Sequence, residues 1–268
     1  MSKSVLKKID PASTGKFKNK VEALKKIQDL QQEMYDLLYL MFAHNQYSLL
    51  IILQGIDTSG KDGAVRHLFS SANPQGIHVY SFKKPTEIEL RHDFLWRCHL
   101  RTPECGLTAI FNRSYYEEVT TVKVHPDLLK AQNIPAASLE RDDFFGRRYQ
   151  HINDFEKMLT QKGTVVLKFF LHISKDEQKR RLQDRLKDSK RNWKFSADDV
   201  KERHYWDDYM EVFDEMIEAT DTKHAPWHVI PANNKWYRDY LISKTTVEAL
   251  RELKMSFPKV KIPITKIR

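Results

Sequence analysis

The feature that most constrains the fold is an apolar run that ends in a glycine-rich turn and continues into a helical segment. Ser48–Gln54 is almost entirely apolar, and Gly55-Ile-Asp57-Thr-Ser-Gly60-Lys61 follows it. This spacing matches the pattern G-x-x-x-x-G-K, and it lies between a strand and a helix, where the pattern requires it. Glycines let backbone N–H groups wrap around phosphate oxygens, while the helix N-terminus and a lysine add positive charge. The alternative is a glycine-rich turn without a ligand, and the strand–loop–helix context disfavours it.

Short apolar runs alternate with longer amphipathic segments along the rest of the chain. The alternation predicts an α/β fold in three layers, with a parallel five-stranded sheet covered by helices on both faces. Ligands of such sheets bind beyond the carboxyl ends of the strands, so the residues after each strand are the candidates for function. We predict strands over Ser48–Gln54, Ile77–Phe82, Leu107–Phe111, Thr164–Leu171 and Trp227–Ile230. We predict helices over Lys61–Ser71, Glu87–Leu100, Leu139–Gln161, Lys175–Lys187 and Ala197–Ala219.

The N-terminal part of the chain precedes this alternation. Residues 1–18 have the composition of a loose arm, and Val21–His44 has apolar residues at helical spacing. We therefore divide the chain into an arm and amphipathic helix over residues 1–45 and one α/β domain with the glycine-rich loop over residues 46–268.

The charge balance favours a polyanionic partner. The chain has 45 Lys and Arg against 36 Asp and Glu, a net charge of +9, although basic proteins without such a partner are common. No run approaches the ~18 apolar residues of a membrane span, and the start lacks an apolar secretory segment, so we expect no membrane partner and a cytoplasmic protein. The two cysteines, Cys98 and Cys105, predict reduced thiols and no zinc site.

One position in the glycine-rich loop departs from the usual pattern. Ser or Thr commonly follows the lysine and holds Mg²⁺, but here Asp62 follows Lys61. Asp57, inside the loop, offers a carboxylate for Mg²⁺ or a base for an incoming phosphate oxygen. A carboxylate beside phosphates repels them unless a metal lies between, which favours the metal-binding role for Asp57.

A second polar segment follows the third apolar run. Asn112 comes directly after it as a neutral oxygen donor, Arg113 is next, and Glu117 lies one helical turn later. Arg113 can bind phosphate through two N–H groups and neutralise charge during transfer. An ordinary surface ion pair is the alternative for this arginine.

A basic segment follows the fourth apolar run. Residues 179–194 contain eight Lys or Arg against two Asp, and Arg181 and Arg185 share one helix face. We interpret the region near residues 175–200 as a helical lid that closes over a phosphate substrate, rather than as a solvated helix face. Lys83 and Lys84, after the second apolar run, are candidate phosphate or nucleotide contacts.

With these segments assembled, the chain resembles the polyphosphate kinase 2 family. The similarity covers roughly residues 50–240, and the form Asn112-Arg-Ser-x-Tyr-Glu117 resembles the class III branch, which acts on nucleoside mono- and diphosphates. The family more often has His or Trp where this chain has Tyr115, so the role of that residue stays open. The matching segments are Gly55-x-Asp57-x-x-Gly60-Lys61-x-Gly63, Asn73-Pro-Gln-Gly76, Phe82-x-x-Pro-Thr86, His92-Asp-Phe-Leu-Trp-Arg97, Phe170-Leu-His-Ile-Ser174, Asn192-Trp-Lys-Phe-Ser196 and His224-Ala-Pro-Trp-x-x-Ile-Pro231.

The resemblance implies a thymidylate-kinase-like P-loop fold that moves phosphoryl groups between inorganic polyphosphate and adenine or guanine nucleotides. It implies Mg²⁺, for which Mn²⁺ can substitute, and a homodimer or homotetramer. Catalytic roles are expected for Asp57, Lys61, Arg113 and Glu117, with Asp57 and Glu117 as metal ligands. Substrate contacts are expected from Gly55, Thr58, Ser59, Gly60, Asp62, Gly63, Arg66, Lys83, Lys84, Asn112, Arg181, Arg185 and Lys194.

Two other functions share parts of this pattern. An ATP-dependent nucleoside monophosphate kinase has the same loop, but is expected to have Ser or Thr at position 62 and a less basic lid. A nucleic-acid-binding P-loop protein also binds a linear polyanion. The sequence contains no recognition-helix motif or aromatic stacking platform, so we expect no nucleic-acid partner.

Overall fold

The structure, a computed structural model, describes residues 4–69, 72–190, 192–195 and 197–259; the side chains of 194 and 197–199 lie outside this description. Its centre is a five-stranded sheet in the order β2-β3-β1-β4-β5, and every pairing is parallel. This confirms the predicted α/β fold and all five strands. Their bounds are Ser48–Gln54 (β1), Ile77–Ser81 (β2), Thr108–Asn112 (β3), Thr164–His172 (β4) and Trp227–Pro231 (β5).

The middle strand, β1, positions the glycine-rich loop. All seven of its residues are buried, because β3 and β4 flank it and helices cover both faces. In the register, Leu53 pairs with Asn112 of β3 and Gln54 pairs with Phe170 of β4. The residues after β1, β3 and β4 therefore meet at one edge of the sheet, as predicted.

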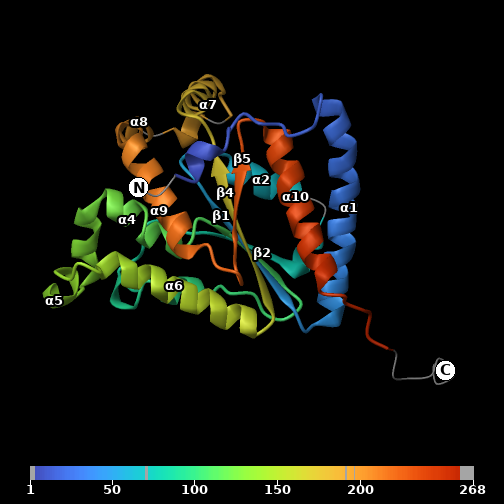
Figure 1. Cartoon of the computed structure of the whole chain (residues 1–268), viewed down its shortest axis with the longest axis horizontal. Coiled ribbons are helices and arrows are strands. Elements are labelled where there is room, and N and C mark those ends of the chain that lie inside the picture. The colour runs from blue at the N-terminus through green and yellow to red at the C-terminus, as the bar shows by residue number, and fades with distance from the viewer. Residues whose placement is uncertain (1–3, 70–71, 191, 196, 260–268) are drawn as a thin grey trace.

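Helices form the outer layers (Figure 1). On one side α1 lies along α10, and α10 also contacts α2 and β5. On the other side α6 contacts β4 and α9. Within the described part of the chain, no helix combines the length and the apolar character that crossing a membrane requires. The bounds of the helices are Lys20–His44 (α1), Lys61–Leu68 (α2), Trp96–His99 (α3), Thr121–Val124 (α4), Ala136–Leu139 (α5), Phe144–Gln161 (α6), Lys175–Lys187 (α7), Ala197–Glu202 (α8), Trp206–Thr220 (α9) and Lys235–Glu252 (α10).

The N-terminal helix follows directly from its sequence. The side chain of Asn19 accepts a hydrogen bond from the backbone N–H of Glu22 and caps the first turn. The helix buries Ile27, Met34, Leu38 and Met41, a spacing that keeps one face on the core. It ends at Asn45, which adopts the left-handed conformation with a φ of 53°.

Residues 6 and 11 of the arm are docked on the rest of the protein, so the prediction of a loose arm was wrong for this part. Leu6 is buried, and its backbone N–H donates to Asp214 at 2.9 Å. Further along, the backbone N–H of Asn233 donates to the carbonyl of Pro11 at 3.0 Å. The arm thus crosses the carboxyl edge of the sheet on its way from α9 to α1 (Figure 1).

Four predicted helices are shorter or broken. Glu87–Leu100 contains only a 3₁₀ turn at Glu89–Arg91 and the four-residue α3, because extended backbone at His92 separates them. Leu139–Gln161 is interrupted between α5 and α6, and a 3₁₀ turn at Arg203–Tyr205 separates α8 from α9. The helix predicted over Lys61–Ser71 ends at Leu68, and residues 70–71 lie outside the described part.

Candidate active site

The glycine-rich loop between β1 and α2 needs its glycines. Gly55 and Gly60 have φ values of 141° and 107°, which side chains rarely adopt. A Cβ at Gly55 would also lie 2.7 Å from the carbonyl oxygen of Leu171 in β4. Thr58 has a φ of 65°, an uncommon conformation for a residue with a branched Cβ. Such backbone conformations are retained where the surrounding structure enforces them, and they concentrate at functional sites.

Lys61 folds back over the loop that precedes it. Its Nζ donates to the carbonyls of Gly55 at 2.6 Å and Ile56 at 3.2 Å. Burial and, to a smaller extent, the charge of Arg113 lower the pKa of Lys61 to about 8, although nearby carboxylates act in the opposite direction. The loop therefore holds a desolvated ammonium group that gains from an anionic ligand.

Arg113 lies between two carboxylates at the end of β3. Its Nη2 is paired with Asp57 from the loop, and its Nη1 is 3.7 Å from Glu117. Arg113 itself has a φ of 65°, which turns the chain at the end of the strand. Burial raises the pKa of the Asp57 carboxyl, but Arg113, Lys61 and Arg185 outweigh burial, and the pKa lies below its ordinary value. The structure thus brings together the predicted catalytic residues Asp57, Lys61, Arg113 and Glu117.

Asn112 holds the carboxylate that replaces the usual Ser or Thr after the loop lysine. Its Nδ2 donates to Oδ1 of Asp62 at 2.7 Å. The sequence suggested Asn112 as a neutral oxygen donor, whereas in the structure its amide nitrogen donates to Asp62. The two residues join the ends of β3 and of the loop, and they direct a carboxylate toward the same edge of the sheet.

The loop also contains hydroxyls that fit an oxygen-rich ligand. Thr58 Oγ1 and Ser59 Oγ are buried without a hydrogen-bond partner among the described residues. Buried polar atoms are normally satisfied, so these two are candidates for contact with phosphate or with water bound around it. In the described chain no three His, Cys, Asp or Glu side chains form a metal cluster. Mg²⁺ is commonly bound through one or two carboxylates beside substrate phosphates, so a three-residue cluster is not a requirement for it.

The predicted lid residues have different locations. Arg181 is buried and points under the loop, where it donates to backbone carbonyls, so it is not a lid contact in this structure. Arg185, one turn later on α7, acts on the pKa of Asp57 through its charge. The side chain of Lys194 lies outside the described part of the chain. Lys83, Lys84 and Arg66 are exposed.

A buried polar cluster supports the segment that carries Arg113 and Glu117. The hydroxyls of Tyr115 and Tyr116 both donate to Oε1 of Glu156, at 2.9 and 2.7 Å. Lys168, in the middle of β4, donates to Oε2 of Glu156 at 2.7 Å. All four side chains are fully buried, and burial raises the pKa of both tyrosines well above its ordinary value, so they remain donors. This cluster answers the question that the sequence left open at Tyr115.

We expect Lys168→Met to destabilise the protein by about 3–5 kcal/mol, because it leaves the Glu156 carboxylate buried without its cation. Denaturant unfolding measures this loss. The double variant Lys168→Met with Glu156→Gln is the control, since glutamine is neutral and its oxygen can still accept from both tyrosines. We expect it to recover part of the lost stability; an equal loss in both variants would contradict this explanation.

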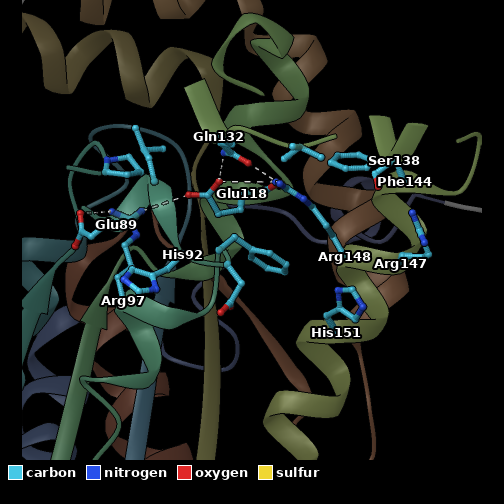
Figure 2. A pocket seen from close by; sticks show the side chains of 15 residues that line it. Glu89, His92, Arg97, Glu118, Gln132, Ser138, Phe144, Arg147, Arg148 and His151 are labelled. Atoms are coloured by element: carbon cyan, nitrogen blue, oxygen red, sulfur yellow. Dashed lines mark hydrogen bonds and ion pairs between the residues drawn. The ribbon is translucent and has the colours of Figure 1, made fainter. Parts of the chain in front are cut away.

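A cavity of about 350 Å³ adjoins the site on the side of Glu118. It is lined by residues from 85–97, 132–138 and 144–151, together with Glu118 itself. Figure 2 shows Glu118 and Gln132 between Arg97 and Arg148.

The polar side chains that line this cavity form hydrogen bonds with one another. Gln132 donates to Glu118 at 2.6 Å and accepts from Arg148 at 2.5 Å. Arg97 donates to the carbonyl of Lys83 at 2.7 Å, which ties the cavity to the segment after β2. The guanidinium of Arg148 lies 4.8 Å from the ring centre of Phe144. The cavity therefore has a mixed lining of hydrogen-bonded polar groups and aromatic rings.

The site residues of this cavity were not predicted from the sequence. In the sequence Arg97 is marked only as the end of a matching segment, and no motif marks Glu118, Gln132 or Arg148 as functional. The available signal was weak: Arg148 lies at a core position of an amphipathic helix, where a charged residue needs buried partners.

Comparisons with known proteins agree on one family. The model of the family described as Polyphosphate kinase 2 matches residues 17–258. The chain is 43% identical over 263 residues to the AMP/ADP-polyphosphate phosphotransferase of Meiothermus ruber, covering 98% of this chain and 94% of that protein. It is 44% identical over 228 residues to the ADP-polyphosphate phosphotransferase of Rhodopseudomonas palustris, covering 85% and 79%. The crystal structure of polyphosphate kinase 2 from Arthrobacter aurescens TC1 superposes with a TM-score of 0.89 at 39% identity, covering 99% of this chain and 91% of that one.

Proposed function

The chain belongs to the polyphosphate kinase 2 family, and we propose that it transfers phosphoryl groups reversibly between inorganic polyphosphate and the nucleotides AMP and ADP, forming ADP and ATP. GMP and GDP are proposed as further acceptors. The reaction exchanges one phosphoanhydride bond for another, so the concentrations of the substrates determine its direction.

The observation that carries this proposal is the placement of Arg113 opposite Lys61. One cation comes from the loop after β1 and the other from the end of β3, and both neighbour the ionised Asp57. Phosphoryl transfer requires positioning and neutralisation of charge rather than covalent chemistry by the protein. Two cations from adjacent strand ends, beside a loop of backbone N–H groups, provide both.

We assign the following roles within this arrangement. The loop N–H groups and Lys61 bind the phosphates, and Arg113 neutralises charge on the phosphoryl group in transit. Kinases of this family act with a divalent metal ion. We propose Mg²⁺, with Mn²⁺ as a substitute; when bound by Asp57 and Glu117 it would neutralise phosphate charge at the transfer point.

The cavity beside Glu118 is the proposed pocket for the acceptor nucleoside. Glu118 directly follows Glu117, and the carbonyl of Lys83 is held by Arg97 of the cavity wall. A base in the cavity would thus extend its phosphates past Lys83 and Glu117 toward Arg113. Exposed lysines in that direction tolerate phosphate chains of different lengths, because an ammonium group acts as a point charge.

We expect Ser138→Trp to raise the KM for ADP at least about tenfold, a loss of about 1.4 kcal/mol of binding, with little change in the KM for polyphosphate. Ser138 lines the cavity from α5, so an indole there would occupy space needed by the base. Steady-state kinetics with each substrate varied in turn measure the effect. Ala137→Trp is the matched control, because Ala137 is exposed on the same helix. Equal changes in both variants would argue against the pocket.

The proposed function is tested by a change of phosphate donor. Purified protein is incubated with AMP and Mg²⁺ in the presence of long-chain polyphosphate, and in parallel with ATP as the sole donor. We expect ADP to rise first and ATP to follow in the polyphosphate reaction. If AMP is untouched while ADP is converted, the acceptor range is narrower than proposed; if only ATP serves as donor, the protein is a nucleoside monophosphate kinase.

A further inference from the structure

The backbone carbonyls of the phosphate loop accept hydrogen bonds from side chains of two other helices, α7 and α10. Four consecutive carbonyl oxygens, from residues 57 to 60, each accept a hydrogen bond from a side chain outside the loop. Gln178 donates to Asp57 O at 3.2 Å, Arg181 to Thr58 O at 3.0 Å and Ser59 O at 2.8 Å, and Arg238 to Gly60 O at 3.1 Å.

Every N–H group of the Arg181 guanidinium donates a hydrogen bond within the protein. Nη1 donates to the two loop carbonyls, Nη2 donates to the carbonyls of Ala232 and Asn233, and Nε donates to Glu177 at 2.6 Å. These five bonds match the five N–H groups that an arginine has. Arg181 therefore joins the loop to the end of β5 and has no N–H group left for a substrate.

Arg238 approaches the loop from α10. It is 2% exposed and is paired with its neighbour Asp239 through Nε and Nη2. Its Nη1 lies so close to Gly60 that a Cβ at that position would collide with it. The glycine before Lys61 is thus required by the buried arginine as well as by its own φ of 107°.

These contacts determine where the loop N–H groups point. In a planar trans peptide, the N–H of a residue points opposite to the carbonyl of the residue before it. Because the carbonyls of Asp57, Ser59 and Gly60 are held on the rear side, the N–H groups of Thr58, Gly60 and Lys61 point toward the opposite side. The N–H of Ser59 is used within the turn, where it donates to Ile56 O at 3.1 Å.

We propose that Arg181 and Arg238 are positioning residues that hold the phosphate loop in its binding conformation from behind, without touching the substrate. The assignment rests on the proposed function for its kinetic assay but not for its binding assay. A guanidinium group serves here better than an ammonium group: that of Arg181 reaches carbonyls on two segments, and that of Arg238 binds the Gly60 carbonyl and the Asp239 carboxylate together.

The test compares Arg181→Lys and Arg238→Lys with the wild type. Lysine keeps the charge but cannot hold two segments together. We expect kcat to fall by about 10²-fold in each, since a displacement of about 1 Å at a reacting group has an effect of that size. The KM for ADP should stay within about twofold, because the nucleoside pocket is separate. Binding of inorganic triphosphate, measured calorimetrically without nucleotide, should weaken in parallel with kcat. Assays are run well below the melting temperature of each variant.

Two further variants make the outcome decisive. Arg180→Lys is the matched control, because Arg180 is the exposed neighbour on α7 and its partners are Glu177 and Asp184; it should behave as wild type. In Arg238→Ala, added guanidinium ion should restore part of kcat and ammonium ion should not, a pattern that a general loss of stability does not produce. Wild-type kcat and triphosphate affinity in folded Arg181→Lys and Arg238→Lys would overturn the proposal. If those two lysine variants do not fold, failure of guanidinium ion to restore kcat in Arg238→Ala would overturn it instead. An inactive wild type would instead contradict the proposed function.

Discussion

Asp57→Asn and Lys61→Met are each expected to lower kcat by about 10²- to 10³-fold or more, the range found when one charge-stabilising group is removed from an active site. Asp57 loses the charge with which it would hold the metal, and Lys61 loses the ammonium that the loop keeps desolvated beside the phosphates. Rapid-mixing assays with saturating polyphosphate and ADP measure the effect on the chemical step.

Both variants should keep the fold. Asp57 is 35% exposed in its ion pair with Arg113, and partly exposed pairs contribute about 0–1 kcal/mol to stability. Methionine can follow the path of the Lys61 stem without the buried charge. Melting temperatures close to wild type are therefore part of the expected result. Substantial activity in either folded variant would remove that residue from the mechanism.

The elements that position the site were predictable because their signals are local. The strand before the loop, the loop itself and the helix after it are contiguous, and the apolar run of β1 ends where the structure ends it. Parallel strands bring their carboxyl ends to one edge, so the meeting of Asp57, Lys61 and Arg113 followed from the fold class alone.

The sequence predictions that differ from the structure concern residues whose contacts lie in distant segments of the chain. Arg181 lies in a basic run that we predict from the sequence to be a lid over a phosphate substrate, but its acceptors are at residues 58, 59, 232 and 233. The helix predicted over Glu87–Leu100 breaks at extended His92, and Arg97 beyond the break is held by the carbonyl of Lys83. Helical periodicity does not report such inward-facing charges, since each is stable only with a partner supplied by the tertiary structure.

Lys168 is an instructive intermediate case. It interrupts the otherwise apolar run of β4, and a charged residue in the centre of a buried strand signals a buried partner. The sequence does not indicate which acid is that partner. The structure identifies Glu156 on α6, and with it the two tyrosine hydroxyls that hold the segment after β3.

Arg113→Ala is expected to lower kcat by about 10³-fold, the lower end of the range for arginines that neutralise charge on a transferring phosphoryl group. Arg113→Lys should recover only a small part of this loss. The arginine reaches Asp57 through Nη2 and Glu117 through Nη1, and a single ammonium group cannot replace both contacts in that geometry.

The KM for nucleotide should change much less than kcat in both Arg113 variants, because the proposed nucleoside pocket does not include this side chain. Single-turnover measurements separate the chemical step from product release. Arg141→Ala serves as the control, since Arg141 is paired with Asp143 at the surface and its loss should leave kcat unchanged. A lysine variant as active as wild type would show that Arg113 acts only as a general positive charge. An alanine variant with normal kcat would place charge neutralisation elsewhere in the site, with Lys61 and Arg185 the remaining cations near Asp57.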